Sequence, residues 1–388
     1  MICNQNDLLA LVERGLKADA VAIDTEFVWE RTYYPRLGVV QVGLPGGDCF
    51  LIDVPAIKDM SPLGRVLADS SVVKILHDAQ QDLTILRRAT GEIPRNIFDS
   101  RLVAGFAGLS STISLRDLLR EVMDVHLAKT ETRTDWLKRP LSERQITYAI
   151  DDVLYLPTVR ERLLSTVSEF KREEWVKEEL DLYDNPSLYE EKDPFVQYQR
   201  LKGTSRLAPV DFAVLRELAA WREREAMRHD RPRGHIIKDE VLVALAKRSP
   251  ASFVELKGVK GFFDKEARLY GSGIIKAVER GRACDEADYP LLPEHRSRDE
   301  ALTARVDLVL AYIKGKCLSC DVDISLVATR ADVTSLLSQG SEAAPSGHRL
   351  LAGWRREFVG EELVQLMAGK QKIMISPDTG LPKMVADD

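Results

Sequence analysis

The segment VAIDTEF, residues 21–27, predicts the central strand of the fold and contains the first two candidate functional residues. Its apolar, β-rich residues indicate a central strand, on which residues two apart point to the same face. Asp24 and Glu26 therefore project together. Carboxylates on a buried strand need partners, because burying an unpaired charge is costly. For an isolated Asp-x-Glu, a solvent-facing pair would be the better interpretation, but the apolar neighbours of this one favour a buried site.

The residues that follow predict a small sheet. VVQVGL (39–44) and CFLID (49–53) are further apolar, β-rich runs, and Pro45-Gly46-Gly47-Asp48 supplies a turn between them. Together with 21–27 they predict a β-meander over residues 20–53. VVKILH (72–77) is a short continuous apolar run that suits a buried strand flanked by helices.

Helical patterns then alternate with this sheet. The one that opens at Ser142 has Gln145 three residues later, which is a capping-box spacing. It contains Tyr148 and continues through LYLPTVRERLLSTV. The other predicted helices cover residues 79–90, 98–108, 114–123 and 159–183. Residues 1–190 are therefore expected to form a mixed α/β domain, a mixed sheet with flanking helices.

The second half of the chain is predicted to be all helical. YDNPSLYEEKDPF (183–195) is polar and marked by proline, as is typical of a linker. Residues 205–285 then predict a small helical bundle. Residues 296–372 repeat a similar spacing of helices, which indicates a diverged duplicate. The tail from residue 370 is expected to be partly extended or disordered.

Composition excludes several classes of protein. The chain has no run of eighteen apolar residues, so we expect no membrane span. Its first fifteen residues predict an amphipathic helix and lack the features of a signal peptide. Five cysteines are an odd number spread over a long chain, which favours a reducing cytoplasm over a disulfide framework.

The charge is unevenly distributed. The chain carries a net charge of −6, yet residues 203–284 hold 17 Lys/Arg against 11 Asp/Glu, a local balance of +6. A basic middle on an acidic chain is a plausible footprint for a polyanion such as RNA. The same balance is also common on solvated helices.

Two further segments complete an acidic constellation. Asp82, in KILHDAQQDL, follows a buried strand near the start of a helix. Tyr148 and Asp152, in YAIDD, are four apart and share a helix face, whereas Asp151 points about 100° away. Asp82 alone could be a helix-start residue, and Asp78 and Asp151 are competitors.

Four clustered carboxylates repel one another unless cations sit between them, and two hard divalent ions with oxygen ligands are the simplest solution. Such a pair can clamp the attacking and leaving oxygens of a displacement at phosphorus. Tyr148 would orient the attacking water, because a phenol with a pKa near 10 is a poor base. The constellation therefore predicts a two-metal phosphodiesterase.

The three segments resemble the motifs of the DEDD superfamily of 3′–5′ exonucleases, which share an RNase H-like fold. Tyr148 four residues before Asp152 is typical of the tyrosine-containing branch. DTEFVWERTYYPRLGVVQVG (24–43) and TDWLKRPLSERQITYAIDDVLYL (134–156) closely resemble ribonuclease D. LRELAAWRERE and RPRGHIIKDEVLVALAKRSP resemble the helicase-and-RNase-D C-terminal (HRDC) module, and the later helices look like a second copy.

The resemblance implies a reaction and a partner. It implies hydrolytic release of 5′-mononucleotides from the 3′ ends of RNA, notably tRNA precursors with 3′ extensions. Independently of the resemblance, we expect a monomer. It implies two divalent metal ions, Mg²⁺ or Mn²⁺, and a water-orienting role for Tyr148. The implied metal ligands are Asp24, Glu26, Asp82 and Asp152. Two alternatives remain: a DNA 3′–5′ exonuclease, and a catalytically silent RNA-binding scaffold, although no expected carboxylate is missing.

Candidate substrate contacts are less specific. Phe27 and Trp29 could stack on the 3′-terminal base or pack in the core. His77 could bind substrate or be a hydrogen-bonded core histidine. Arg133 and Arg139 could contact phosphates or be surface charges. The densest basic cluster, a candidate for steering tRNA, includes Arg222, Arg231 and Arg233.

Overall fold

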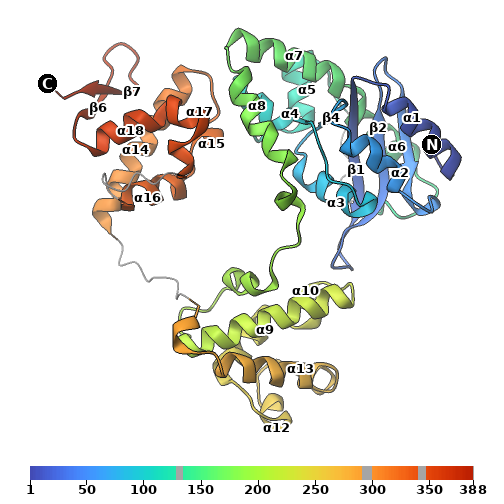
Figure 1. Ribbon diagram of the computed structural model, residues 1–388, viewed down its shortest axis with the longest axis vertical. Helices are drawn as coiled ribbons and strands as arrows, with labels where there is room; N and C mark the ends of the chain where they lie inside the picture. The colour runs from blue at the N-terminus through green and yellow to red at the C-terminus, as the bar shows by residue number, and fades with distance from the viewer. Residues whose placement is uncertain (128–133, 291–298, 340–346, 388) are drawn as a thin grey trace. The chain divides into compact units, whose positions relative to one another are not determined.

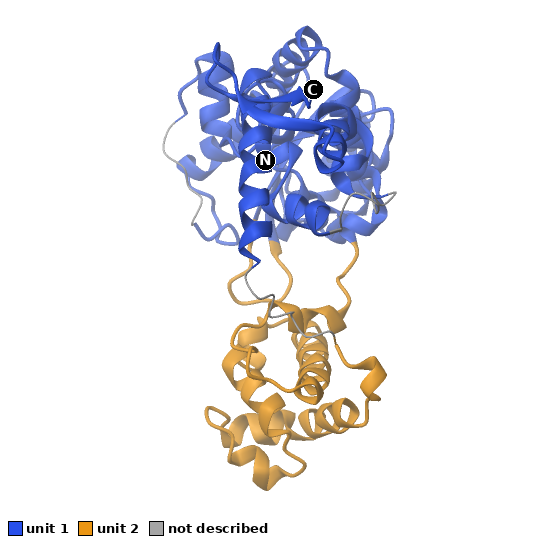
Figure 2. Cartoon of the chain, turned by 90° about the vertical axis from the view of Figure 1, so that its left-hand side faces the viewer, with its two compact units in different colours: residues 1–26, 37–189, 297–388 blue, residues 27–36, 190–296 orange. Residues whose placement is uncertain are grey.

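The computed structural model divides the chain into two compact units (Figures 1 and 2). Unit 1 comprises Met1–Glu26, Leu37–Tyr189 and Ser297–Asp388, and unit 2 comprises Phe27–Arg36 and Glu190–Arg296. The residues that the structure describes are 1–127, 134–290, 299–339 and 347–387.

Unit 1 is built on the expected mixed sheet. Its strand order is β3-β2-β1-β4-β5. β2 and β3 pair antiparallel, whereas β1 pairs parallel with β4, and β4 with β5. The strand bounds are β1 Ala20–Val28, β2 Arg36–Gly43, β3 Cys49–Asp53, β4 Val73–Leu76 and β5 Ile97–Asp99. The predicted meander and the strand within 72–77 are therefore confirmed.

The last strand, β5, was absent from the sequence prediction, which placed residues 98 and 99 in a helix. Ile97, Phe98 and Asp99 are all buried and pair with β4. The helix begins only at Ser100, because the Asp99 side chain caps it by accepting the backbone N–H of Arg101 at 2.9 Å. A three-residue strand is too short to show a periodic pattern.

Helices cover both faces of the sheet. Val21 and Ile23 of β1 share a core with α1 (Gln5–Gly15), α2 (Ser61–Ala68) and α3 (Gln80–Thr90). Ala20 and Ala22, on the opposite face, share a core with α4, α5 and α7. These helices span Ser100–Phe106, Leu115–Met123 and Leu156–Glu169. Successive side chains of β1 therefore point alternately into two helical layers. Asp24 lies on the same face of the strand as Ala20 and Ala22.

The long helix predicted from Ser142 is divided into separate helices. α6 spans Glu143–Leu154, and α7 begins with Pro157 in its first turn. Proline lacks the N–H that a continuous helix would use, so the helix restarts there. A second break, at Lys171 with φ +57°, separates α7 from α8 (Glu173–Asp181).

The first half of the predicted linker packs against unit 1. It forms two 3₁₀ turns, Leu182–Asp184 and Pro186–Tyr189. The Tyr183 hydroxyl donates to Asp99 at 2.7 Å, and Tyr189 is buried. The linker prediction was wrong for these residues. It rested on their polar composition, whereas Tyr183 and Tyr189 attach the segment to unit 1.

Unit 2 is the expected helical bundle together with the segment between β1 and β2. The Tyr33 hydroxyl donates to the Glu223 carboxylate, and Asp230 accepts the backbone N–H groups of Tyr33 and Tyr34, each at 3.1 Å. The bundle has its own core of buried apolar side chains. Its helices are α9 Pro209–Arg228, α10 Arg233–Ile236, α11 Asp239–Arg248, α12 Phe253–Lys257 and α13 Asp264–Arg282, preceded by the 3₁₀ helix η4 Pro194–Arg200.

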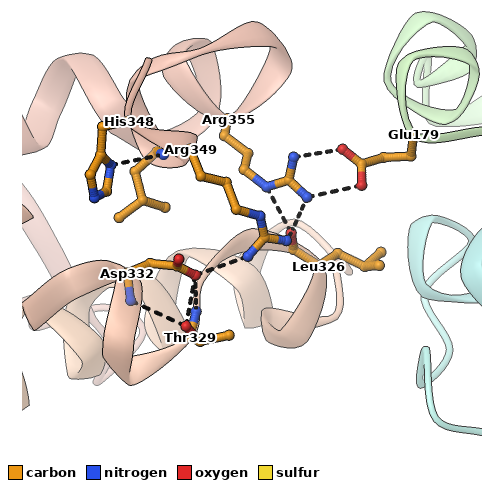
Figure 3. Close-up of polar contacts among 8 residues, drawn as sticks. Glu179, Leu326, Thr329, Asp332, His348, Arg349 and Arg355 are labelled. Atoms are coloured by element: carbon orange, nitrogen blue, oxygen red, sulfur yellow. Dashed lines mark hydrogen bonds and ion pairs between the residues drawn. The ribbon is translucent and has the colours of Figure 1, made fainter. Parts of the chain in front are cut away.

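The C-terminal helices belong to unit 1, where they share a core with α4, α5 and α7. Arg355 makes a buried ion pair with Glu179 of α8 (Figure 3). The helical elements are α14 Glu300–Ser319, α15 Ile324–Val327, α16 Arg330–Gln339, α17 Gly353–Arg355, the π-helical segment Arg356–Gly360 and α18 Glu361–Met367. The tail is partly extended, as predicted, with β6 (Gln371–Ile375) paired to β7 (Pro382–Ala386).

The domain limits 1–190, 205–285 and 296–372 stay a prediction. Within the described part of the chain, no helix combines the length and the apolar character needed to cross a membrane.

Candidate active site

Three carboxylates converge at the end of β1. Oxygens of Asp24, Glu26 and Asp152 all lie within 4.8 Å of one another, and we call these residues the acidic triad. The first two come from one face of β1, as strand alternation predicts. Asp152 comes from α6, which packs against the sheet.

Local sequence fixes how α6 reaches the sheet. The capping box of Ser142 and Gln145 sets where the helix begins. Gly43 of β2 lets it approach closely, because a Cβ there would lie 3.0 Å from the Val153 carbonyl oxygen. Tyr148 lies one turn before Asp152, on the same helix face, and its ring centroid is 6.1 Å from that of the buried Trp136.

Asp82, the fourth predicted ligand, lies beside the triad and is not one of its three members. It stands in the first turn of α3 and is buried. Its Oδ1 accepts a hydrogen bond from the Thr25 hydroxyl, on the opposite face of β1 from Asp24. The Asp82 charge nevertheless raises the pKa values of both Asp24 and Glu26.

The triad is electrostatically unfavourable without a cation. Burial, followed by the charges of Asp152 and Asp82, raises the pKa of the Glu26 carboxyl to about 8. Burial raises the pKa values of Asp152 and Asp82 to about 7, although each accepts a hydrogen bond that lowers it. Burial and the same neighbouring charges also raise the pKa of Asp24 well above its usual range.

The donor set fits a divalent metal. All the groups are carboxylate oxygens, which Mg²⁺ and Mn²⁺ prefer. Gln41 is fully buried and donates from Nε2 to Asp24 Oδ2 at 3.2 Å, which orients that carboxylate. The Asp152 Oδ2 atom is buried and has no hydrogen-bond partner in the described structure, as expected of an oxygen reserved for a cation.

Tyr148 is held in its neutral form. Burial, then the charges of Asp152, Glu26 and Asp24, raise the pKa of its hydroxyl far above its ordinary value of 10. In the metal-free protein the group therefore keeps its proton at physiological pH. It can donate or accept a hydrogen bond at the edge of the triad.

A cleft of about 990 Å³ opens over Asp24, Tyr148 and Asp152. Three arginines also line it: Arg101, Arg116 and Arg144. The sequence analysis missed all three as candidate contacts. Arg144 had a detectable signal, because it precedes Tyr148 by one helical turn and so shares its face. Arg101 and Arg116 had no such signal in the sequence, because the packing of α4 and α5 in the folded domain places them at the cleft.

Asp99 fixes the start of α3 relative to α4. Its carboxylate accepts the backbone N–H groups of Asp78 at 3.1 Å and Ala79 at 3.0 Å, as well as that of Arg101. Asp78 has φ +65°, so this sharp turn after β4 is held by the side chain of another strand. The turn leads directly into the helix that carries Asp82.

The predicted stacking residues differ in exposure. Trp29 is 63% exposed, and Phe27 is half-buried at the end of β1. The exposure of Trp29 is compatible with stacking on a base. For both residues the contact with a nucleotide stays a prediction.

His77 and Arg139 have their polar atoms engaged within the protein. His77 Nε2 donates to the Ile113 carbonyl at 3.1 Å, and Nδ1 lies 2.9 Å from the Ser100 hydroxyl. Burial lowers the pKa of this imidazole, which is consistent with a neutral ring. The Arg139 guanidinium uses all three nitrogens to bind Asp53 and backbone carbonyls, among them that of Gly38. These bonds give Arg139 a structural role. They also engage both ring nitrogens of His77, which nevertheless lines the cleft with Asp24. For both residues the contact with substrate stays a prediction.

The remaining basic candidates vary in accessibility. Arg133 lies outside the described residues. Arg231 is exposed, whereas Arg222 is 4% exposed and donates to Asp239 at 2.7 Å. Arg233 is half-buried and pairs with Glu223. A steering role for these residues stays a prediction.

Comparisons with known proteins agree with this geometry. A family model described as a 3′-5′ exonuclease matches residues 1–168, and an HRDC domain model matches residues 211–278. The chain is 42% identical to ribonuclease D of Desulfotalea psychrophila over 363 residues, which cover 92% of this chain and 96% of that protein. It is 34% identical to ribonuclease D of Pseudomonas paraeruginosa, over 89% and 92% of the two chains.

A solved structure shows the same arrangement. The crystal structure of Escherichia coli RNase D, described as an exoribonuclease involved in structured RNA processing, matches with a TM-score of 0.82 and 31% identity. The match covers 95% of this chain and 98% of that one. Together with the RNase H-like sheet, the acidic triad and the HRDC bundle, these relatives show that the chain belongs to the ribonuclease D family and is a 3′–5′ exoribonuclease.

Proposed function

We propose that this exoribonuclease uses two divalent metal ions to remove 5′-mononucleotides from the 3′ extensions of tRNA precursors. The observation that carries the proposal is the convergence of Asp24, Glu26 and Asp152, with their raised pKa values and with Asp82 beside them. Buried carboxylates at this separation are stable as anions only when cations neutralise them.

Each part of the cleft has a role in this proposal. The acidic triad and Asp82 would hold Mg²⁺ or Mn²⁺, which when bound neutralises the site, polarises the phosphodiester and activates water. The Tyr148 hydroxyl orients that water by hydrogen bonding. Arg101, Arg116 and Arg144 line the same cleft and supply positive charge for the RNA backbone.

The RNA specificity rests on the family, whose E. coli member is described as an exoribonuclease involved in structured RNA processing. The test is degradation of a tRNA with an extended 3′ tail, beside matched single-stranded RNA and DNA oligonucleotides. We expect trimming of the tail and faster release from RNA. Equal or faster release from DNA would overturn the RNA assignment, and failure to trim the tRNA while degrading RNA oligonucleotides would overturn the tRNA assignment alone.

Tyr148→Phe should reduce turnover by about a hundredfold, the typical effect of a single group that positions or exchanges a proton. The ring still packs beside Trp136, so folding and metal binding should be preserved. Single-turnover rates would measure the loss, and calorimetric titration with Mn²⁺ would serve as the control. Wild-type turnover in this variant would remove Tyr148 from the mechanism.

Metal affinity should rise with pH between about 6 and 8. Glu26, with a pKa of about 8, and Asp82 and Asp152, with pKa values of about 7, are partly protonated at neutral pH in the metal-free protein. Because a cation binds the deprotonated form, binding releases protons and strengthens by up to about tenfold per pH unit for each proton displaced. Calorimetry in buffers of different ionisation enthalpy measures that release. An affinity independent of pH over this range would contradict the raised pKa values.

A cytoplasmic location and a monomeric state complete the proposal. None of the five cysteines forms a disulfide, which suits a reducing compartment. Size-exclusion chromatography with light scattering would test the monomer, and fractionation of cells would test the location.

A further inference from the structure

Asp99 is a buried carboxylate outside the acidic triad, and its two oxygens have different partners. It lies at the end of β5 and is 3% exposed. Its Oδ1 accepts the backbone N–H groups of Asp78 at 3.1 Å and Arg101 at 2.9 Å. Its Oδ2 accepts the backbone N–H of Ala79 at 3.0 Å and the hydroxyl of Tyr183 at 2.7 Å. Tyr183 and the residue before α3 therefore share one oxygen of this carboxylate.

The turn that Asp99 binds leads from the cleft into α3. Asp78 lines the cleft and has φ +65°, a left-handed conformation that its surroundings must support. Ala79 is the residue before α3, is fully buried, and has no polar side chain that could cap the helix. The hydrogen bonds to Asp99 therefore fix where α3 begins.

The position of Asp82 depends on where α3 begins. This carboxylate stands in the first turn of the helix and is buried. The Thr25 hydroxyl donates to its Oδ1 from β1, so the side chain is held by the strand and the backbone by the helix. Groups that hold a metal ion must keep their positions to within about 0.5 Å. Even a small shift at the start of α3 would therefore impair Asp82 as a ligand.

Tyr183 is well placed to hold the Asp99 carboxylate. Burial, followed by the Asp99 charge, raises the pKa of its hydroxyl far above the ordinary value of 10, so the group keeps its proton and donates. The Tyr183 carbonyl accepts the Tyr189 hydroxyl at 2.6 Å. The neighbouring Asp184 accepts the backbone N–H of Asn96, just before β5, at 2.9 Å. Because its backbone is fixed, Tyr183 can keep the Asp99 carboxylate in one orientation.

We propose that Tyr183 is a positioning residue for the exonuclease reaction. Its hydroxyl orients Asp99, which fixes the start of α3 and, through the helix, Asp82. Tyr183 lies outside the residues that line the cleft, so it acts through Asp99 alone. The inference rests on the role of Asp82 as a metal ligand, which is part of the function proposed above. Removing a partner that orients the groups around a metal typically lowers metal affinity or activity by about 10–100-fold, and the indirect route from Tyr183 favours the lower value.

The test compares full-length variants that each lose one group. Tyr183→Phe removes only the hydroxyl that reaches Asp99. Tyr189→Phe is the matched control, because it removes a hydroxyl from the same segment whose bond goes to the Tyr183 carbonyl instead. Asp82→Asn tests the proposed metal ligand itself. The measurements are kcat and KM on a short single-stranded RNA with Mg²⁺, Mn²⁺ affinity by calorimetry, and urea unfolding in EDTA.

We expect Tyr183→Phe to lower both kcat and Mn²⁺ affinity by about tenfold. KM should stay unchanged, because Arg101 binds the other oxygen of Asp99 and keeps its place at the cleft. Tyr189→Phe should match wild type in kcat, KM and Mn²⁺ affinity, although both tyrosine variants lose some stability to urea with their hydrogen bonds. Adding Asp99→Asn to Tyr183→Phe should cost less than the product of the two single losses, because the residues share one bond.

The outcomes separate this inference from the function on which it rests. Wild-type Mn²⁺ affinity in Asp82→Asn would overturn the metal role of Asp82, and this inference with it. Weakened Mn²⁺ binding in Asp82→Asn, together with unchanged kcat or unchanged Mn²⁺ affinity in Tyr183→Phe, would overturn the positioning role of Tyr183 alone. Equal losses of kcat in the two tyrosine variants would reduce the effect to attachment of the segment and would also overturn it.

Discussion

Asp24→Ala should reduce exonuclease activity by about a thousandfold or more. Asp24 belongs to the acidic triad, and one of its carboxylate oxygens lies within 4.8 Å of an oxygen of Glu26 and of one of Asp152. Removing it takes away a proposed metal ligand and the group that Gln41 orients. Metal ions contribute several kcal/mol to charge stabilisation in the transition state, and each ~1.4 kcal/mol changes the rate tenfold.

The measurement is release of nucleotides from a 3′-extended RNA under single-turnover conditions. Asp19→Ala is a matched control, because Asp19 is exposed immediately before the same strand. Since burial and like charges make Asp24 unfavourable as an anion, its removal should leave the metal-free protein at least as stable as wild type. Retention of wild-type activity by Asp24→Ala would refute the catalytic assignment, and unfolding of the variant would refute the electrostatic account.

Arg355→Ala should lower the free energy of unfolding of unit 1 by about 3–5 kcal/mol, the usual cost of breaking a buried ion pair from one side. Arg355 is 5% exposed and Glu179 is 7% exposed. Two guanidinium nitrogens donate to the two oxygens of Glu179, at 2.5 and 3.0 Å, and Leu326 accepts two more bonds (Figure 3). Among the described residues, the variant would leave the buried Glu179 carboxylate with only the Trp354 indole N–H as a side-chain donor, at 2.9 Å.

Urea unfolding followed by tryptophan fluorescence would measure this loss, because Trp175 and Trp354 stack in the same core. Arg356→Ala is the control: its ion pair with Glu361 is exposed and should contribute only about 0–1 kcal/mol. The double variant Glu179→Gln/Arg355→Gln should lose less than the sum of its single changes, because the two residues share one interaction. Equal shifts for Arg355→Ala and Arg356→Ala would contradict the buried-pair account.

Local patterns in the sequence predicted most of the residues that converge at the candidate active site. Strand alternation put Asp24 and Glu26 on one face, and helical spacing put Tyr148 and Asp152 on another. The same helical spacing extended to Arg144 would have found a third residue of α6 in the cleft. These features depend on neighbours within a few residues along the chain, which periodicity describes well.

Contacts between residues that are far apart in the sequence could not be predicted from local periodicity. The bond from Thr25 to Asp82 joins residues 57 apart, and that between Glu179 and Arg355 joins residues 176 apart. Nothing in either local sequence indicates the other partner. Likewise, β5 is too short for a pattern, and Tyr183 lies in a stretch whose polarity suggested a linker although its hydroxyl anchors Asp99.

Unit 2 is built from two separate segments of the chain, which limits how the protein can be divided into fragments or how its domains can be exchanged with those of relatives. Its residues come from two separate parts of the chain, Phe27–Arg36 and Glu190–Arg296. A recombinant fragment that begins at residue 190 would lack Tyr33 and therefore lose a donor to Glu223, which is 1% exposed. A nuclease fragment that ends at residue 189 would keep the 27–36 segment but lose Glu223 and Asp230, its partners. Transferring unit 2 to a relative would thus require Phe27–Arg36 to be transferred together with Glu190–Arg296.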